Sequence, residues 1–69
     1  MTEIQQRLKT LTRREHEVLN HVIDGLANKQ VADQMGITLR TVKAHRAKVM
    51  AKMRATSVAQ LVTMVLRSG

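Results

Sequence analysis

The chain has 69 residues, of which 43% are hydrophobic and 25% charged, so it can close one small hydrophobic core but not two. Twelve Lys and Arg residues against five Asp and Glu residues leave a formal net charge of +7, an excess that indicates a polyanionic partner. Because the chain has no Cys and no apolar run of membrane-spanning length, we expect a cytoplasmic domain without disulfides, thiolate metal sites or transmembrane helices. The absence of Phe, Tyr and Trp removes the side chains that stack on unpaired bases, which favours a double-stranded nucleic acid over a single strand.

The distribution of charge and of helix-forming residues favours an all-α fold. All five acids fall before residue 34, so the second half of the chain carries only positive charge. Pro is absent, Gly occurs only at positions 25, 36 and 69, and polar and apolar residues do not alternate over any long stretch. This pattern predicts long helices with two internal breaks rather than strands. We therefore expect a compact four-helix bundle.

The first predicted helix begins with a capping box. The Thr12 hydroxyl can accept a hydrogen bond from the amide of Glu15, while the Glu15 side chain accepts one from the amide of Thr12. Apolar residues between Val18 and Ile23 then share one helix face, and Gly25 can end the helix in the left-handed conformation. We predict a helix over residues 13–24. Residues 1–10 fit either a linker or a short N-terminal turn, and the sequence does not decide between the two.

Three further helices are expected within a domain that spans residues 11–67. Asn28 is a suitable cap for a helix over residues 29–35, which Gly36 ends, and Thr38 is a suitable cap for a helix over residues 39–53. The inner stripe of this longer helix is expected to contain Leu39, Val42, Val49, Met50 and Met53. Weak periodicity over residues 54–57 predicts a break before a last helix over residues 58–67.

Residues 28–45 have the spacing of a DNA-binding helix-turn-helix. Ala32 is small where two helices would cross closely, Gly36 can take the positive φ of a tight turn, and Val42 would anchor the second helix to the core. Two ordinary packed helices joined at a glycine would show the same spacing. The outer face of the second helix is therefore needed to separate the two interpretations.

That outer face combines cations with small residues. With about 100° between successive residues of a helix, the side opposite Val42 contains Arg40, Lys43, Ala44, Ala47 and Ala51, and Lys48, Lys52 and Arg54 lie toward its flanks. Residues 37–54 include six basic residues and no acid. Small side chains allow a helix to enter a major groove about 12 Å wide, where cations reach base edges and phosphates. The pattern thus favours a recognition helix over a merely solvated one.

Individual roles follow from position on this helix. Lys43, near the N-terminal end, can reach guanine O6 or N7. Thr38, Thr41 and the first amides of the helix can hold a phosphate, and Asn28 and Lys29 offer the same chemistry one helix earlier.

Two residues lie away from the centre of the outer face. Arg46 falls near the inner stripe, so we expect it to pair with Glu15 or Glu17 rather than to contact a base. For His45, a hydrogen bond to a phosphate and simple packing are equally compatible with its place on the flank.

Three segments together closely resemble the LuxR/FixJ/NarL-type DNA-binding domain, and its FixJ-like response-regulator branch in particular. They are residues 11–19 (LTRREHEVL), 25–32 (GLANKQVA) and 41–46 (TVKAHR), and the match runs in order over roughly residues 10–67. The resemblance implies a four-helix domain whose third helix enters the major groove and whose fourth helix forms a dimer contact.

The resemblance also implies roles for single residues. Positions that face bases match Lys43, Ala44 and Ala47, and positions that face the DNA backbone match Asn28, Lys29, Thr38, Thr41 and His45. Helical geometry adds Arg40 to the base-facing set and Lys48 to the backbone-facing set. Ala47 departs from relatives that carry a long side chain there, so its contact is expected to reduce to a methyl group.

The last predicted helix is too apolar to serve the core alone. Its apolar residues between Val58 and Leu66 occupy an arc of roughly 220°, wider than the ~100° stripe that one core needs. We assign Leu61 and Val65 to the core, and Val62, Leu66 and Ala59 to a homodimer interface used on DNA. The surplus could instead contact residues 2–10 or a domain outside this chain.

The chain lacks the parts of a complete signalling protein or an enzyme. Its only aspartates, Asp24 and Asp33, lie in predicted helices, so no phosphoacceptor pocket exists and a phospho-receiver domain is expected elsewhere, with RNA polymerase as a further partner. His16 and His21 are about 140° apart on a helix and do not share a metal-binding face. We expect no enzymatic activity, no cofactor and no bound metal.

Alternative functions remain open at this point. A sigma-factor-like promoter-binding module would use the same helices without dimerisation. A basic module that binds membrane surfaces or acidic proteins would use the same cations, although such helices normally insert bulky anchors in place of alanines.

Overall fold

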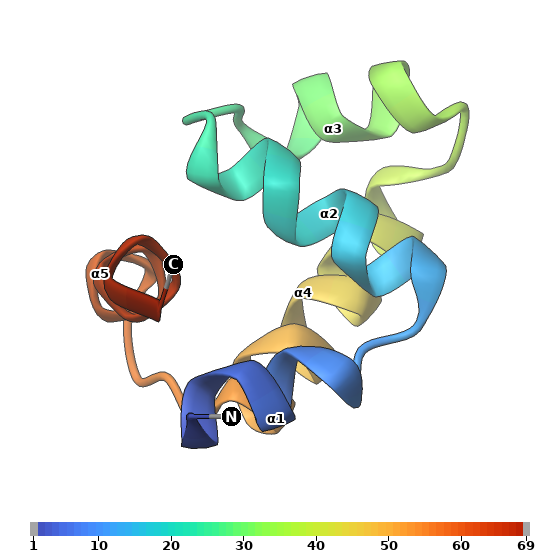
Figure 1. Cartoon of the computed structure of the whole chain (residues 1–69). Helices are drawn as coiled ribbons and strands as arrows, with labels where there is room; N and C mark the ends of the chain where they lie inside the picture. Colours follow the sequence, from blue (N-terminus) through green and yellow to red (C-terminus); the bar gives the residue numbers. More distant parts are fainter. Residues whose placement is uncertain (1, 69) are drawn as a thin grey trace.

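Five helices make up residues 2–68, the part of the chain that the computed structural model describes (Figure 1). They are α1 (Glu3–Lys9), α2 (Arg13–Ile23), α3 (Asn28–Met35), α4 (Leu39–Met53) and α5 (Val58–Ser68). The expected all-α class is confirmed, but the expected number of helices was one too low. The longest helix, α4, packs against α1, α2 and α3, and α5 packs against α1 at the side of the molecule (Figure 1).

The additional helix is α1. It lies within residues 1–10, which the sequence predicted to be either a linker or a short N-terminal turn. It begins with a capping box, in which Gln5 N donates to Thr2 Oγ1 (3.2 Å) and Thr2 N donates to Gln5 Oε1 (3.0 Å). A seven-residue helix is unstable by itself. Ile4 and Leu8 pack against the core, and this docking stabilises the helix. The Thr2–Gln5 pair is a local signal for the start of this helix, but the contacts that stabilise the helix come from segments far along the chain.

Hydrogen bonds to carbonyl groups hold α1 to the ends of two other helices. Arg7 Nη1 donates to the carbonyl oxygen of Met53, the last residue of α4 (3.3 Å). Gln5 Nε2 donates to the carbonyl oxygen of Ser68 at the end of α5 (3.2 Å). Both carbonyls belong to the last turn of a helix, where no intrahelical donor is available.

The start and end of α2 follow the sequence prediction closely. The Thr12–Glu15 capping box is present, with Glu15 N donating to Thr12 Oγ1 (3.2 Å) and Thr12 N to Glu15 Oε1 (2.9 Å). Gly25 has φ +85°, and the amide of Leu26 returns to the carbonyl of His21 (3.1 Å). Asp24 is the C-cap, so the helix is one residue shorter than predicted.

The cap of α3 was predicted wrongly. Ala27, not Asn28, is the N-cap, and Asn28 is the first helical residue. Ala27 has no side-chain acceptor, but its amide donates to Gln30 Oε1 (2.8 Å), so half of a capping box remains. This arrangement leaves the Asn28 side chain available for a contact outside its own helix. At the other end Gly36 has φ +66°, as expected of the turn.

One side of α4 supplies the centre of the core. Val42, Val49 and Met53 are buried, and they meet Val18, Leu19 and Val22 from α2, Val31 and Ala32 from α3, and Leu61 from α5. Leu39 was expected on this inner stripe but is 43% exposed, since it is the first residue of α4 and lies outside the buried core cluster. The Thr38 cap is confirmed by the 3.1 Å bond from Thr41 N to Thr38 Oγ1.

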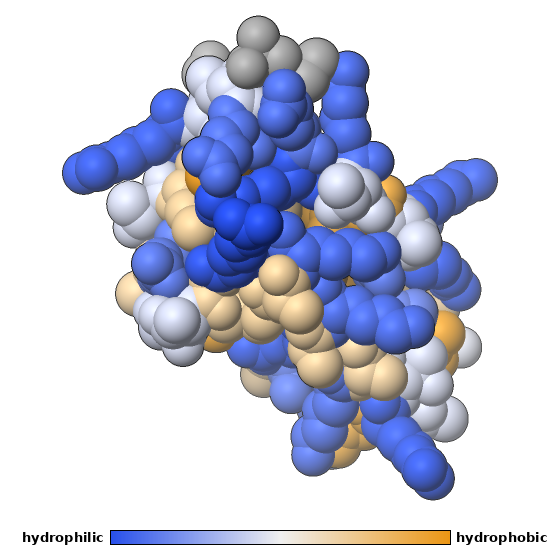
Figure 2. All heavy atoms as spheres, turned by 90° about the horizontal axis from the view of Figure 1, so that it is seen from below, coloured by the Kyte–Doolittle hydropathy of each residue, from blue (hydrophilic) through white to orange (hydrophobic). Residues whose placement is uncertain are grey.

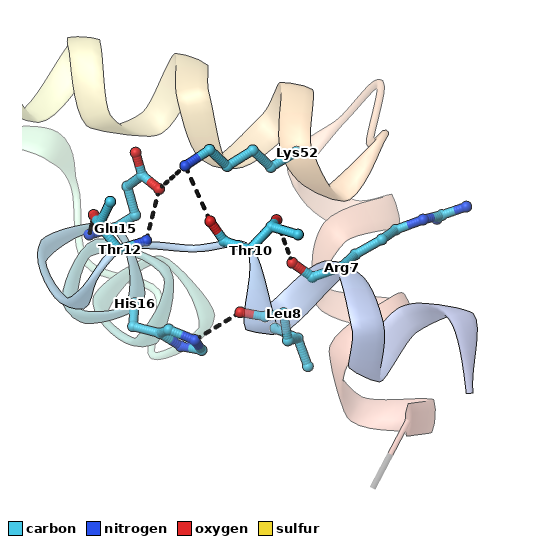
Figure 3. Close-up of polar contacts among 7 residues, drawn as sticks. All are labelled: Arg7, Leu8, Thr10, Thr12, Glu15, His16 and Lys52. Carbon is cyan, nitrogen blue, oxygen red and sulfur yellow. Dashed lines mark hydrogen bonds and ion pairs between the residues drawn. The ribbon is translucent and has the colours of Figure 1, made fainter. Parts of the chain in front are cut away.

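A buried carboxylate joins three helices near the start of α2. Glu15 is only 2% exposed and accepts a hydrogen bond from Lys52 Nζ of α4 at 2.6 Å (Figure 3). The same ammonium group donates to the carbonyl oxygen of Thr10, just after α1 (3.1 Å). Bonds from Lys52 and from the Thr12 amide lower the pKa of Glu15 against the opposing effect of burial.

Glu15→Gln is expected to lower the free energy of unfolding by about 1–3 kcal/mol at neutral pH, because the amide loses the charge-assisted bond to Lys52. An unfolded glutamate has a pKa of about 4.3, and the lower pKa in the folded state makes the stabilisation complete above that pH and progressively lost as the pH falls toward the folded-state value. The difference between wild type and variant should therefore shrink in acid. Urea unfolding over a pH series measures it.

Glu17→Gln is the matched control for this substitution. Glu17 lies on the same helix and pairs at the surface with Arg14 (2.9 Å), so its loss should change stability by less than about 1 kcal/mol. Equal and pH-independent losses in the two variants would contradict the role given to Glu15.

Candidate nucleic-acid interface

The outward side of α4 is a cationic face without acids. Its exposed residues are Arg40, Lys43, Ala44, Ala47, Lys48 and Ala51. None of the three cations forms an ion pair within residues 2–68, so each remains available for a ligand. Seen from below relative to Figure 1, the molecule carries long hydrophilic side chains around a strip of weakly hydrophobic atoms (Figure 2).

The helix-turn-helix positions have the expected packing. Ala32 and Val42 are buried, at 7% and 0% exposure. Gly36 ends α3 in the left-handed conformation, and the amide of Ile37 donates to the carbonyl of Ala32 (3.1 Å). The two helices therefore pack closely enough for α3 to brace α4, while the outer side of α4 stays free.

The N-terminal end of α4 combines hydroxyl groups with unpaired amides. Thr38 Oγ1 accepts from the amide of Thr41 and lies 2.9 Å from Thr41 Oγ1. The first amides of any helix lack intrahelical acceptors and carry partial positive charge, a combination that favours an anion. Thr38 is exposed and Thr41 half-buried, so both hydroxyls lie at the edge of the cationic face.

The partner predicted for Arg46 was wrong. Its Nη1 donates to Oδ1 of Asn28 at the start of α3, and not to Glu15 or Glu17. Glu15 is bonded to Lys52, and Glu17 pairs with Arg13 and Arg14 on its own helix. Sequence reasoning could not find this contact, because the two residues are eighteen positions apart and meet only through the crossing of α3 and α4.

At the end of the acid-free stretch, one cation is committed to the fold and a second pairs only loosely at the surface. Lys52 is bonded to Glu15 and Thr10, and Arg54 lies 4.0 Å from Glu3. Arg54 also has φ +55°, the left-handed conformation that ends α4. The cations left for a ligand are therefore concentrated in the first two-thirds of α4.

The remaining predicted contact residues border the same face. Lys29 is exposed, and Asn28 and His45 are half-buried. Asn28 and Lys29 belong to the start of α3, whereas His45 belongs to α4. The predicted contact residues thus come from two helices, which the bond from Arg46 to Asn28 joins.

The apolar residues of α5 differ in burial: those expected in the core are covered, and the others are at least partly exposed. Leu61 is buried and Val65 packs against the core, whereas Leu66 is 69% exposed and Ala59 is exposed. Val62 is half-buried beside them. A separate hollow of about 300 Å³ lies between α1 and α5, with Ile4 and Met64 among its lining residues.

The family model for bacterial regulatory proteins of the luxR family matches residues 9–65. The chain belongs to this family. It is 51% identical over 67 residues to the transcriptional regulatory protein FixJ of Rhizobium meliloti (strain 1021), covering 97% of this chain and 33% of FixJ. It is 48% identical over 50 residues to the C4-dicarboxylate transport transcriptional regulatory protein DctR of Rhodobacter capsulatus, covering 72% of this chain and 25% of DctR.

Solved structures of response regulators have the same fold. The response regulator StyR superposes with a TM-score of 0.92 at 43% identity, over 94% of this chain and 33% of StyR. Full-length FixJ from B. japonicum gives a TM-score of 0.90 at 40% identity, over 97% of this chain and 33% of FixJ. The luxR-type chain described here spans about a third of the length of these proteins, and it belongs to a family of regulators rather than of enzymes.

Two other kinds of site have no candidate within residues 2–68. No group of three or more His, Cys, Asp or Glu side chains is arranged to hold a metal ion. None of the helices has the length and apolar content needed to cross a bilayer.

Lys52→Met is expected to destabilise the protein by about 1–3 kcal/mol, because buried Glu15 would lose its cationic partner. Lys48→Met, one turn earlier on an exposed position of α4, should change stability by no more than about 0.5 kcal/mol. Chemical unfolding of both variants measures the difference. Similar losses would show that Lys52 is not the structural cation inferred here.

Proposed function

We propose that this luxR-type domain binds double-stranded DNA in a sequence-specific manner, as the output domain of a FixJ-like response regulator that controls transcription. The cationic, acid-free outer face of α4 is the observation that carries the proposal. The names of the relatives, transcriptional regulatory proteins and response regulators, support it.

Base recognition is assigned to the centre of that face. Lys43 and Arg40 are long enough to reach acceptors on guanine from the first turns of α4, and Ala44 and Ala47 permit close approach and contact with thymine methyl groups. All four residues are exposed. The short alanine side chains make α4 thin at its middle, which suits a helix that enters a groove.

Contacts with the DNA backbone are assigned to the edges of the face. They comprise Asn28, Lys29, Thr38, Thr41, His45 and Lys48. These residues supply N–H and O–H donors or positive charge, the groups that bind phosphate oxygens. Because they come from both α3 and α4, they would fix the orientation of α4 in the groove.

Dimerisation on DNA is assigned to α5. Val62, Leu66 and Ala59 form an apolar strip beside the buried Leu61, and a two-fold pair of such strips would bury a small area. Association is therefore expected to be weak in solution and stronger on a two-fold DNA site. For the regulator as a whole, we also propose a phospho-receiver domain outside this chain, a contact with RNA polymerase and a cytoplasmic location.

The two alternative functions, a sigma-factor-like promoter-binding module and a basic module that binds membranes or acidic proteins, lose support. The family match is to luxR-type regulators and not to sigma factors. A membrane-binding face would need exposed bulky anchors, but the middle of the α4 face is alanine.

Selection of bound duplexes from a random DNA pool tests sequence-specific binding directly. We expect an enriched two-fold site with half-sites about one helical turn apart. Vesicles of anionic phospholipid form the second arm of the experiment and should bind weakly. Enrichment of no sequence, together with strong vesicle binding, would overturn the proposal.

Lys43→Ala is expected to cost about 1–3 kcal/mol of binding free energy on the selected site and to relax the base preference at one position. Arg14→Ala, a change of one exposed cation on α2, is the control and should leave the preference unchanged. Titration of fluorescent duplexes with matched and altered sites provides the measurement. If Lys43→Ala discriminated between the duplexes as well as wild type, the base contact would be assigned to the wrong residue.

Val62→Asp is expected to reduce cooperative binding to a two-fold site while leaving affinity for a single half-site nearly unchanged, because a charge would be placed in the apolar strip. Thr63→Asp, which adds the same charge at the neighbouring exposed position, is the control. Gel-shift titration on full and half sites separates the two effects. Equal cooperativity in both variants would contradict an interface on this side of α5.

A further inference from the structure

The contact between Arg46 and Asn28 is the only direct hydrogen bond between side chains of α3 and α4 within residues 2–68. Arg46 is half-buried on the side of α4 that packs against α3, and Asn28 is half-buried at the start of α3. No carboxylate pairs with the guanidinium group in this part of the chain. The positive charge of Arg46 is thus held in place by a neutral partner and is not cancelled.

The chemistry of the two groups fixes the orientation of the Asn28 amide. A guanidinium group has only donors, so the atom that faces it must be the amide oxygen. The Nδ2 group, with two N–H donors, must therefore point away from Arg46. An amide without such a partner could present either end to a ligand.

The remaining donors of the pair are not fully buried. Among the described residues, the only buried side-chain nitrogen or oxygen atom without a hydrogen-bond partner is Nε of Arg7. Asn28 Nδ2 and the remaining nitrogens of Arg46 have no protein acceptor in residues 2–68, and none of these atoms is fully buried. Lys29 follows Asn28 in the sequence, Lys43 lies one turn before Arg46 on α4, and both lysines are exposed. Donors and positive charge are gathered here without a competing acceptor.

We infer that Arg46 and Asn28 form a preassembled clamp for a single DNA phosphate, in which Arg46 is a positioning residue that turns the donor end of the Asn28 amide outward. This inference rests on the proposed DNA-binding function. A phosphodiester group offers acceptor oxygens and one negative charge, which match the free donors and the uncancelled charge of the pair. The clamp spans the helix crossing, so one phosphate contact would hold α3 and α4 in their relative orientation on DNA.

Asn28→Asp separates the clamp from a purely structural brace. The carboxylate would still accept from Arg46, and with a stronger charge-assisted bond, so the thermal unfolding midpoint should be equal or higher. Its outward end would be an anionic acceptor instead of a donor, and it would cancel the charge of Arg46. Affinity for duplex DNA should then fall by about tenfold to a hundredfold, and the slope of log affinity against log salt should flatten by about one unit.

Gln30→Glu is the matched control, because it adds the same charge two residues away on α3. Gln30 is exposed and its oxygen accepts from the amide of Ala27, a bond that glutamate can also make. Its effect on affinity should be several-fold smaller than that of Asn28→Asp, with the salt slope retained. Fluorescence anisotropy of a labelled duplex at several salt concentrations measures both quantities.

Each outcome of the experiment decides between the hypotheses. If Asn28→Asp and Gln30→Glu weaken binding equally, the clamp is refuted while DNA binding stands. If the wild type binds no duplex, the proposed function fails and the clamp fails with it. Should Asn28→Asp not fold, Arg46→Met takes its place: methionine removes both the charge and the donor to Asn28 Oδ1, so a wild-type affinity and salt slope for that variant would overturn the clamp.

Discussion

Once the core has packed, the bond between Glu15 and Lys52 locks the relative placement of the segments around α4. Burial of a carboxylate is costly unless its charge is compensated, and here Lys52 and the Thr12 amide compensate it together. Because the Lys52 ammonium also binds the carbonyl of Thr10, one buried charge fixes the end of α1, the start of α2 and the last turns of α4 relative to one another. The cationic face of α4 is thereby held at a defined angle to the rest of the domain.

The helix α4 combines two opposite requirements along its length. One side is fully apolar and supplies Val42, Val49 and Met53 to the core. The other side carries cations and alanines, which give little to stability but leave a smooth and positively charged surface. A helix with like charges on one face is destabilised by their repulsion, so it depends on packing by α1, α2 and α3 to remain intact. Recognition and stability are therefore assigned to different sides of the same element.

Packing also explains why basic residues of similar appearance have different roles. Lys48 and Lys52 are one turn apart in the same acid-free stretch, yet Lys48 is exposed and Lys52 is bonded to a buried carboxylate. Arg46 is half-buried and keeps an uncancelled charge because its partner is an amide. The net charge of +7 is thus divided between cations that build the fold and cations that are left for a polyanion.

The sequence by itself determined the features that depend on neighbouring residues. These are the Thr12–Glu15 capping box, the Thr38 cap, the turns at Gly25 and Gly36, the inner stripe around Val42, and the exposed face of α4. Each follows from hydrogen bonds or side-chain periodicity within a few positions of the chain, and the resemblance to luxR-type regulators rests on the same segments.

Only the tertiary structure decided the features that join distant segments. The helix α1 exists because Ile4 and Leu8 dock on the core and Arg7 bonds the end of α4. Leu39, the first residue of α4, lies outside the buried core. The partners of Lys52 and Arg46 depend on where α2 and α3 cross α4, an arrangement set by the packing of the whole core and not encoded in any local stretch.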